Sequence, residues 1–517
     1  MGSLMVIQTN PPISEAGLQP PFITALLNDP SCYDHEVTSL QLIETHISWV
    51  ILTGTFAYKI KKPVDLGFLN FSTLALRRQA CINEVKLNRR LASGIYLGVV
   101  AISGSSAQPR MNDEDGTFEY AVKMCQFSPD ATLDSLSRRG ELGNPQIDTL
   151  AARLARFHLS ECATTPADSA WGKPEAILKP VMENFRILDK KVDKQDCSRL
   201  AQLQDWSLSE HQRLSPLMHE RKQLGMIREC HGDMHLGNIA WADERLIIFD
   251  CIEFSEELRW IDIMSEVAFC CMDLLHRQHQ NLAFRFLNAW LEATGDYSGV
   301  ALLRYYAVYR TMVRAKVAAM HPSGATELQE CMQLAEQLIQ PAQPQLWITH
   351  GLSGCGKTTL SQSMLQDQGM LRLRSDVERK RLNGFTATAS SNSEISTGIY
   401  SKTADRHTYQ HLAQHTERLL EARWPVIVDA TFLARWQRDM FREIARRMMI
   451  TFQILDIRAP LPTLRARIAR RATQEQDASE ADIRVLQHQI ETAEALGDDE
   501  LNDVMQQTVQ QKKSRQI

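Results

Sequence analysis

Two short segments of the chain carry the residue types that hold and transfer phosphoryl groups. The first is Gly351-Leu352-Ser353-Gly354-Cys355-Gly356-Lys357-Thr358-Thr359, between an apolar run at 346–349 and a predicted helix at 357–365. Its glycines let successive backbone N–H groups face one concavity, and the helix adds its positive N-terminal end. The pattern predicts a phosphate-binding loop that contacts nucleotide through Gly351, Ser353, Gly354, Cys355, Gly356, Lys357, Thr358 and Thr359.

Two side chains of this loop have separate expected tasks. Lys357 places a positive charge at the β- and γ-phosphates of ATP, where it also acts on the phosphoryl group in transfer. The hydroxyl of Thr358 is expected to ligate Mg²⁺. The competing interpretation, a glycine-rich turn that merely opens a helix, explains neither the lysine nor the threonine.

Two carboxylates follow predicted strands of the same region. Asp376 comes after the run at 371–375, and Asp429 ends the apolar run at 426–428. Ligands of open α/β sheets gather at the carboxyl ends of strands. Asp376 could therefore accept a proton from an attacking hydroxyl, and Asp429 could orient Mg²⁺ or its water. The alternatives are a helix N-cap for Asp376 and a strand-end cap for Asp429.

An arginine-rich run at 464–471 follows the last apolar strand of this half. Guanidinium groups on a closing helix could stabilise charge on the transferred phosphoryl group, and we single out Arg467 and Arg471. Which of them reaches the phosphates stays open. The alternative is a basic helix face in contact with solvent.

The order of these motifs resembles that of the small P-loop kinases related to polynucleotide kinase, gluconate kinase and zeta toxins. The resemblance covers roughly residues 345–495 and includes Arg374-Ser375-Asp376 and Val426-Ile427-Val428-Asp429-Ala430-Thr431. It implies that Asp376 is the general base and that a lid arginine reaches the phosphates. It does not select among sugars, nucleic-acid 5′-hydroxyls and other acceptors.

The second segment is His231-Gly232-Asp233-Met234-His235-Leu236-Gly237-Asn238. Asp233 and Asn238 have the spacing of a kinase catalytic loop, in which the Asp meets the acceptor hydroxyl and the Asn ligates the metal. The apolar strand at 246–249 then ends in Asp250, the expected second metal ligand.

Such a site also needs a strand lysine that pairs with a helical glutamate. Lys59 lies in a predicted strand, and Glu84 lies in a predicted helix at 76–92. Lys61 lies on the same face of that strand as Lys59, because side chains alternate along a strand. We prefer Lys59 as the group that holds the phosphates, with Lys61 as the alternative.

The segment around 231–262 resembles the aminoglycoside phosphotransferase and choline kinase-like family, which is built like protein kinases. The resemblance covers roughly residues 35–320 and implies that Asp233 is the catalytic base and that Asn238 and Asp250 ligate Mg²⁺. It also implies that Asp262 braces the loop by hydrogen bonds. A bacterial group has this domain fused to a P-loop kinase, and the whole chain resembles that group.

The elements that must position these residues suggest two domains. The polar, proline-containing segment at 340–345 cannot continue a helix, so we expect domains at 1–340 and 345–517. The first is predicted to be a two-lobed, protein-kinase-like α+β fold with a small sheet lobe and a larger helical lobe. The second alternates strand and helix, which predicts an α/β fold with a parallel sheet and helices on both faces.

Composition excludes several classes of protein. The chain has 57 Lys+Arg and 62 Asp+Glu, so a basic surface over the whole chain is excluded. Eleven cysteines in 517 residues are too few for a disulfide scaffold. The N-terminal residues lack a signal-peptide pattern, and no apolar run is long enough to span a membrane. We therefore expect a cytoplasmic protein without a membrane partner, and the sequence does not indicate its oligomeric state.

The leading hypothesis is a bifunctional enzyme with two Mg²⁺–ATP sites, each of which phosphorylates a hydroxyl acceptor, expected to be a small molecule. One alternative is an N-terminal kinase that a nucleotide-sensing or nucleotide-hydrolysing P-loop domain regulates. Another is a nucleic-acid-end kinase in the C-terminal half. It is not favoured, because the basic residues there are not interleaved with aromatic ones.

Overall fold

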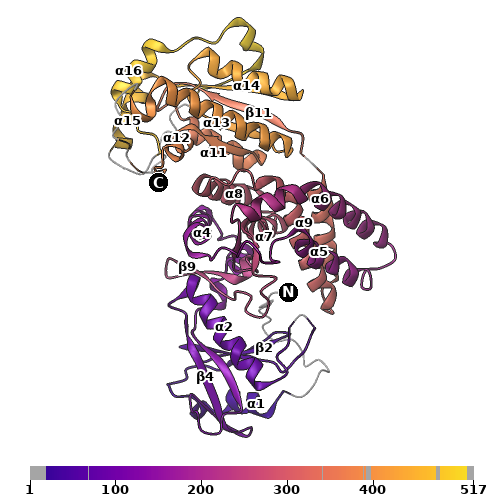
Figure 1. The fold of residues 1–517 in the computed structure, drawn as a ribbon. Coiled ribbons are helices and arrows are strands. Elements are labelled where there is room, and N and C mark those ends of the chain that lie inside the picture. Colours follow the sequence, from indigo (N-terminus) through magenta and orange to yellow (C-terminus); the bar gives the residue numbers. More distant parts are fainter. Residues whose placement is uncertain are drawn as a thin grey trace. The chain divides into compact units, whose positions relative to one another are not determined.

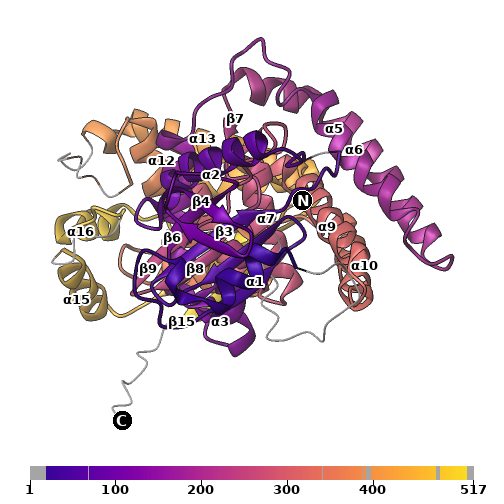
Figure 2. The ribbon, with the colours of Figure 1, turned by 90° about the horizontal axis from the view of Figure 1, so that it is seen from below.

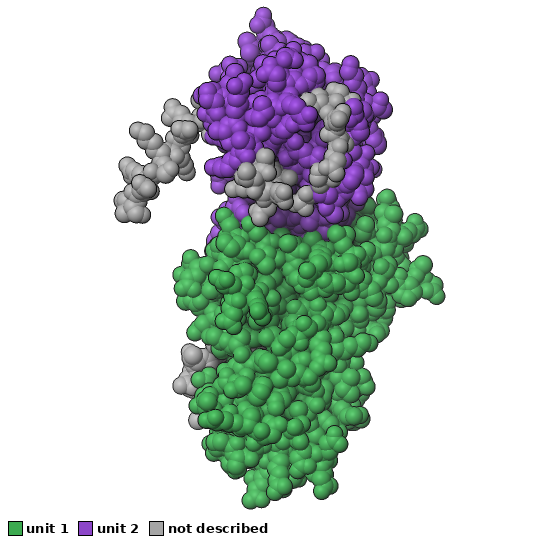
Figure 3. Space-filling model, turned by 90° about the vertical axis from the view of Figure 1, so that its left-hand side faces the viewer, with its two compact units in different colours: residues 1–277, 305–335 green, residues 278–304, 336–517 purple. Residues whose placement is uncertain are grey.

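The computed structural model describes residues 19–67, 69–340, 342–387, 389, 391, 397–472 and 478–508 (Figure 1). The N-terminal residues examined for a signal peptide, and Pro341 of the expected domain boundary, lie outside this set. By compactness the chain divides into two units, residues 1–277 with 305–335 and residues 278–304 with 336–517 (Figure 3). In the described ranges, no helix combines the length and the apolar character that crossing a membrane requires.

The first unit begins with a six-stranded sheet in which every neighbouring pair of strands is antiparallel. The strand order is β1-β2-β3-β6-β4-β5. The strands are β1 (Gln41–Glu44), β2 (Ser48–Leu52), β3 (Phe56–Lys61), β4 (Tyr96–Ser105), β5 (Gln108–Met111) and β6 (Glu119–Cys125). This sheet confirms the predicted β-structure over residues 42–62.

Both faces of this sheet are covered, and strand alternation decides what each face carries. Tyr58 and Ile60 of β3 pack in a core with helix α1 (Pro21–Asn28). Ala57 faces the other way and packs with helix α2 (Leu74–Ala92), which lies across the sheet in Figure 2. Because side chains alternate along a strand, Lys59 and Lys61 share the α2 face with Ala57.

The rest of the first unit is mainly helical. Two short antiparallel ladders interrupt it, β7 (Ile227–Glu229) with β10 (Trp260–Asp262) and β8 (Ile239–Ala242) with β9 (Arg245–Ile248). The long helices α5 and α6 lie side by side (Figures 1 and 2). The helices are α3 (Leu133–Arg139), α4 (Asn144–Arg156), α5 (Pro174–Leu188), α6 (Cys197–Gln223), α7 (Ile263–His276), α9 (Val300–Met320) and α10 (Ala325–Ile339), of which α9 begins in the second unit.

The second unit is built on a parallel five-stranded sheet of order β12-β13-β11-β14-β15. This confirms the predicted parallel sheet; the edge strand β15 was not predicted. The strands are β11 (Gln345–His350), β12 (Leu371–Arg374), β13 (Val426–Asp429), β14 (Thr451–Arg458) and β15 (Val504–Thr508). The helices are α11 (Lys357–Gln368), α12 (Ser375–Leu382), α13 (Lys402–Glu421), α14 (Arg435–Met448), α15 (Leu461–Ala472) and α16 (Ile483–Thr492).

Helix α8 (Gln280–Thr294) joins the second unit although it precedes the proline-containing segment by some fifty residues. The buried Asn288 of α8 donates from Nδ2 to the Met370 carbonyl oxygen at 3.0 Å and accepts from the Arg372 amide at 2.7 Å. Residues 278–304 therefore belong to the second compact unit, whereas the predicted division places them in the first domain. The reason is that side chains of α8 form hydrogen bonds with the backbone at β12, the edge strand of the second sheet.

Candidate active sites

The loop at 231–238 brings the predicted base and the predicted metal ligand together. Asn238 donates from Nδ2 to both the carbonyl oxygen and the Oδ2 carboxylate oxygen of Asp233, each at 3.0 Å. A short 3-10 turn at Leu236–Asn238 bends the chain so that the side chain of Asn238 comes back to Asp233. The other amide atom of Asn238, Oδ1, is buried and has no hydrogen-bond partner among the residues that the structure describes. A buried oxygen of this kind is costly unless it meets a cation or another donor.

The loop is braced by Glu266 of α7, a residue that the motif did not indicate. Its Oε1 accepts the backbone N–H groups of His231 at 2.7 Å and Gly232 at 2.8 Å. Its Oε2 lies 2.9 Å from Nε2 of His158, which is also buried. The carboxylate thereby fixes the backbone immediately before Asp233.

The predicted bracing role of Asp262 is wrong. Its carboxylate forms a two-pronged ion pair with Arg221, with both N···O distances at 2.7 Å, and caps α7 by accepting the Met264 amide. Asp262 ends β10, so its side chain lies at the start of α7. The loop is held one helical turn later, by Glu266.

Asp233 is buried yet ionised. Burial acts to raise the pKa of its carboxyl, but neighbouring positive groups, His235 first among them and then His231, together outweigh burial and hold the pKa below its ordinary value. Nε2 of His235 lies 3.4 Å from Oδ2 of Asp233. The carboxylate is thus in the form that can accept a proton.

A buried cluster of two lysines and three carboxylates lies between β3, α2 and the segment after β9. Nζ of Lys59 lies 2.9 Å from Oε1 of Glu84 and also pairs with Asp250. Nζ of Lys61 lies 2.5 Å from Oε2 of Glu84 and also pairs with Glu253. The shared Glu84 confirms that both lysines face α2, and Lys59 is the one beside Asp250.

Electrostatics keep Glu84 and Lys59 charged despite their burial. Burial raises the pKa of Glu84, but the two lysines outweigh burial and lower the pKa to about 2. Burial lowers the pKa of Lys59, but Asp250 and Glu84 hold it well above its ordinary value. The third carboxyl differs, because burial raises the pKa of Glu253.

Asp250 adopts a left-handed backbone conformation, with φ of +63°. Aspartate tolerates this region better than most residues, although the conformation carries strain. The turn is held because the Asp250 amide donates to the hydroxyl of Tyr96 at 3.0 Å and the next amide donates to Oδ1 of Asn88 at 2.8 Å. The result directs Asp250 toward Lys59.

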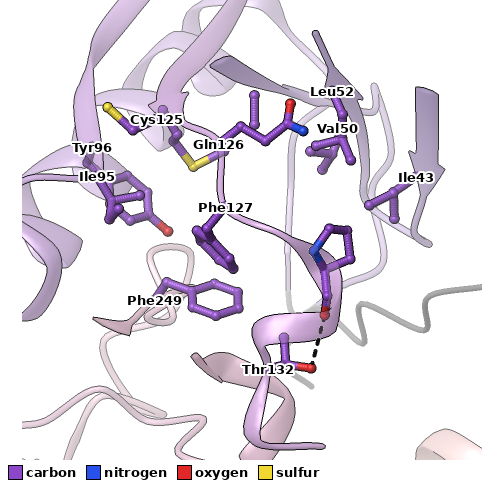
Figure 4. Close-up of a pocket in the computed structure, with 13 residues that line it drawn as sticks. Ile43, Val50, Leu52, Ile95, Tyr96, Cys125, Gln126, Phe127, Thr132 and Phe249 are labelled. Atoms are coloured by element: carbon purple, nitrogen blue, oxygen red, sulfur yellow. Dashed lines mark hydrogen bonds between the residues drawn. The ribbon is translucent and has the colours of Figure 1, made fainter. Parts of the chain in front are cut away.

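An apolar pocket adjoins this cluster (Figure 4). Figure 4 shows Phe127 and Phe249 at one side, and their ring centroids are 5.0 Å apart. Tyr96, whose hydroxyl accepts from Asp250, lines the same pocket. Strands β1 and β2 supply Ile43, Val50 and Leu52. Most of the side chains that line the pocket are apolar, as in many small-molecule sites.

The phosphate loop of the second unit lies between β11 and α11, as its sequence predicts. Gly351 has φ of +141°, and a Cβ there would collide with the Ile457 carbonyl oxygen, so the position requires glycine. Nζ of Lys357 donates to the carbonyl oxygens of Gly351 and Leu352, each at 3.0 Å. The lysine ammonium therefore lies against the phosphate loop, where it is expected to contact the phosphates of ATP.

Two side chains from the C-terminal helices hold this loop. Nη1 of Arg467, on α15, donates to the carbonyl oxygens of Gly354 and Cys355, each at 3.1 Å. Oε1 of Gln489, on α16, accepts the Ser353 amide at 2.9 Å. The motifs gave no signal for Gln489. Arg471 is placed differently, because its Nη2 donates to the Ala481 carbonyl oxygen at 2.7 Å.

The two predicted carboxylates of the second unit come from neighbouring strands. Strands β12 and β13 are paired so that Arg374 lies opposite Asp429, and Asp376 follows in the first turn of α12. The buried Asp429 accepts a hydrogen bond from Oγ of Ser361 at 3.3 Å, and Ser361 also donates to the Thr358 carbonyl oxygen. Asp429 therefore lies beside the first turns of α11.

The residues of both units suit Mg²⁺, which prefers oxygen ligands. In the first unit, the unpartnered Oδ1 of Asn238 and the carboxylate of Asp250 fit a cation. In the second unit, Asp429 and the hydroxyl of Thr358 are oxygen donors on neighbouring elements. Thr359 and Thr358 are both exposed on α11.

Comparison with known proteins identifies both halves. Residues 133–303 match the family described as "Phosphotransferase enzyme family", and residues 346–496 match the one described as "AAA domain". Together with the two folds, these matches define an ATP-dependent kinase. Kinase families of this kind use ATP and usually Mg²⁺.

The chain is similar over most of its length to the uncharacterized protein Rv2004c of Mycobacterium tuberculosis. The two are 30% identical over 433 residues, which are 81% of this chain and 84% of the relative. The chain belongs to the same family as this relative.

Solved structures match each half separately. A sugar kinase from Janibacter sp. HTCC2649 is 21% identical and covers 32% of this chain and 85% of its own, with a TM-score of 0.26. A choline/ethanolamine kinase family protein from Mesorhizobium loti is 9% identical and covers 59% of this chain and 90% of its own, with a TM-score of 0.38.

Proposed function

We propose that the chain is a bifunctional phosphotransferase, with one Mg²⁺–ATP site in each unit and a small-molecule hydroxyl acceptor at each. The observation that carries this proposal is the contact between Asp233 and Asn238. It sets an ionised carboxylate beside a buried amide oxygen that still needs a positive partner.

In the first unit, the apolar pocket is the proposed site of the adenine ring. Lys59, held by Glu84, is the proposed contact to the phosphates, because it lies beside Asp250 whereas Lys61 pairs with Glu253. Asn238 and Asp250 are the proposed ligands of Mg²⁺, which when bound neutralises phosphate charge. Asp233 accepts the proton of the acceptor hydroxyl as its oxygen bonds to the γ-phosphorus of ATP, while the bond from that phosphorus to the β–γ bridging oxygen breaks and ADP leaves.

In the second unit, the backbone of the phosphate loop and Lys357 are proposed to bind the phosphates of ATP. Asp376 is the proposed base, since the register of β12 and β13 sets the start of α12 beside the strand that ends in Asp429. Asp429 and Thr358 are the proposed holders of Mg²⁺. Arg467 is proposed as the lid arginine that reaches the phosphates, because it already contacts the loop, whereas Arg471 contacts Ala481.

The test uses γ-labelled ATP, a panel of hydroxyl acceptors and the full chain. Asp233→Asn should abolish label transfer to one acceptor class, and Asp376→Asn should abolish transfer to another, each by about 100-fold or more. The matched controls are Asp243→Asn in the β8–β9 turn and Asp367→Asn at the end of α11, both exposed. Transfer that survives in both active-site variants would refute the two assignments.

A further inference from the structure

A cluster of two histidines and a glutamate, none of them among the proposed phosphoryl-transfer residues, lies on α12 and α13 of the second unit. His411 and His415 are one turn apart on α13, and Glu378 projects from the adjacent α12. Nε2 of His411 lies 3.2 Å from Oε2 of Glu378 and 3.1 Å from Nε2 of His415. The three ligand-type atoms all lie within 4.8 Å of one another.

Hydrogen bonding satisfies this arrangement only if Glu378 and His415 share the single Nε2 proton of His411. Nε2 of a neutral imidazole either carries a proton or offers a lone pair, and it cannot do both. If Nε2 of His411 donates to Glu378, it has no lone pair for His415. If it accepts from His415, its lone pair faces the carboxylate of Glu378. One nitrogen with two close partners is better explained by a cation that all three atoms share.

The spacing fits a tetrahedral metal ion. With Zn–N and Zn–O bonds of about 2.0–2.1 Å, tetrahedral geometry separates neighbouring ligand atoms by roughly 3.3–3.4 Å. The observed separations of 3.1 and 3.2 Å need only a small outward movement of the side chains. A pair of histidines at i and i+4 on one helix is a common way to present two such ligands.

The charge arrangement of the cluster also suits a metal. Arg381 pairs with Oε1 of Glu378 and leaves Oε2 toward the histidines.

We propose that Nε2 of His411, Nε2 of His415 and Oε2 of Glu378 bind one Zn²⁺ ion, with water as the fourth ligand. His411 provides access, because its side chain is 22% exposed, whereas that of Glu378 is fully buried. The ion would join α12 to α13. Since α12 carries Asp376 in its first turn, the expected role is to fix the helix that positions this residue.

The direct test measures metal binding to the tag-free full chain without nucleotide. After removal of metal, the wild type should bind one equivalent of Zn²⁺, and Co²⁺ at the same site should give the visible absorption of a four-coordinate ion. His411→Gln/His415→Gln should weaken binding by more than about 100-fold. His407→Gln, an exposed histidine on the same helix, is the matched control and should bind like the wild type.

Thermal unfolding gives a second measurement that does not depend on activity. Zn²⁺ should raise the Tm of the wild type and of His407→Gln but not that of the double variant, because only a folded site gains from binding. The proposal is overturned if the wild type gives no four-coordinate Co²⁺ spectrum, or if the double variant binds Zn²⁺ as tightly as the wild type. A wild type without a four-coordinate Co²⁺ spectrum overturns the proposal whether or not the variant folds. Loss of the spectrum in a folded double variant assigns it to this cluster and not to the buried group of His158, Cys230 and Glu266.

Discussion

Single residues of the first site differ in ways that their motifs do not show. Lys59 and Lys61 flank Ile60 on the same strand and share the partner Glu84, but each pairs with a different second carboxylate. Lys59 pairs with Asp250, at the proposed metal position, and Lys61 pairs with Glu253, three residues further on. The carboxylate that each lysine meets therefore distinguishes a ligand-binding role from a structural one.

The amide oxygen of Asn238 gives the first prediction at this scale. Asn238→Ala should raise the Mg²⁺ concentration needed for half-maximal label transfer by about 10-fold or more, because a buried oxygen donor is lost. The measurement is a Mg²⁺ titration of the acceptor that depends on Asp233. Asn83→Ala on α2, whose amide makes an exposed contact with Gln79, should leave the titration unchanged.

The second prediction concerns Glu266. Glu266→Gln replaces an acceptor of three hydrogen bonds by a group with one acceptor oxygen, so the variant should be about 2 kcal/mol less stable at pH 7. As a positioning residue, it should lower kcat more than it changes KM for ATP. A variant with normal kcat would contradict the bracing role.

The pH dependence of this variant follows from the sign of the shift. Burial raises the pKa of Glu266, but the hydrogen bond and charge of His158, the charge of His231 and the Gly232 amide together outweigh burial, so the pKa lies below its ordinary value. A lowered pKa contributes stability above the ordinary carboxyl pKa of 4.5, and that contribution is lost as the pH falls through the lowered value. In urea unfolding, the difference in the free energy of unfolding between the wild type and Glu266→Gln should therefore become smaller below about pH 4.5.

At the scale of elements, the sequence motifs correctly predicted the helices and strands that directly precede or follow them in the chain. The structure contains the strand before the phosphate loop, the helix after it and the strands that end near Asp376 and Asp429. Short apolar runs and glycines at their ends specify these elements locally, so the sequence alone was enough to predict them. Glu266 and Gln489 escaped prediction for the opposite reason. Their partners lie more than thirty residues away in sequence, so only the folded chain brings them together.

Helix α15 provides the prediction at this scale. Arg467→Ala should lower the turnover of the Asp376-dependent reaction by about 10-fold or more, because the guanidinium group is proposed to move from the loop carbonyls to the phosphates. Arg465→Ala removes an exposed arginine from the same helix and should have little effect. Equal effects of the two substitutions would mean that general positive charge, and not position, matters.

At the scale of the whole molecule, the division between units could not be predicted from the proline-containing segment alone. That segment marks a real change from helix to strand, but α8 had already contributed its side chains to the second sheet. The spacing of apolar residues in α8 predicts a helix, but it does not indicate which of the two hydrophobic cores the helix packs against. Arg372, paired with Glu292 of α8 at 2.7 Å, decides that question in the structure.

The corresponding prediction tests α8 in the full chain. Asn288→Ala should destabilise the second unit by roughly 1–3 kcal/mol, because the buried Arg372 amide loses its acceptor. Asn281→Ala, an exposed substitution on the same helix, should be neutral. Thermal unfolding followed with and without ATP reports the effect, and equal Tm values for the two variants would exclude the proposed role of α8.

The path of the chain has a consequence for cleavage. The backbone passes from one unit to the other near residues 277, 304 and 335, so a single cut does not separate them. A protease that nicks the segment at 340–345 would leave the N-terminal fragment holding α8, and with it part of the packing of the C-terminal fragment. The nicked fragments should consequently co-elute in native chromatography and part only in denaturant.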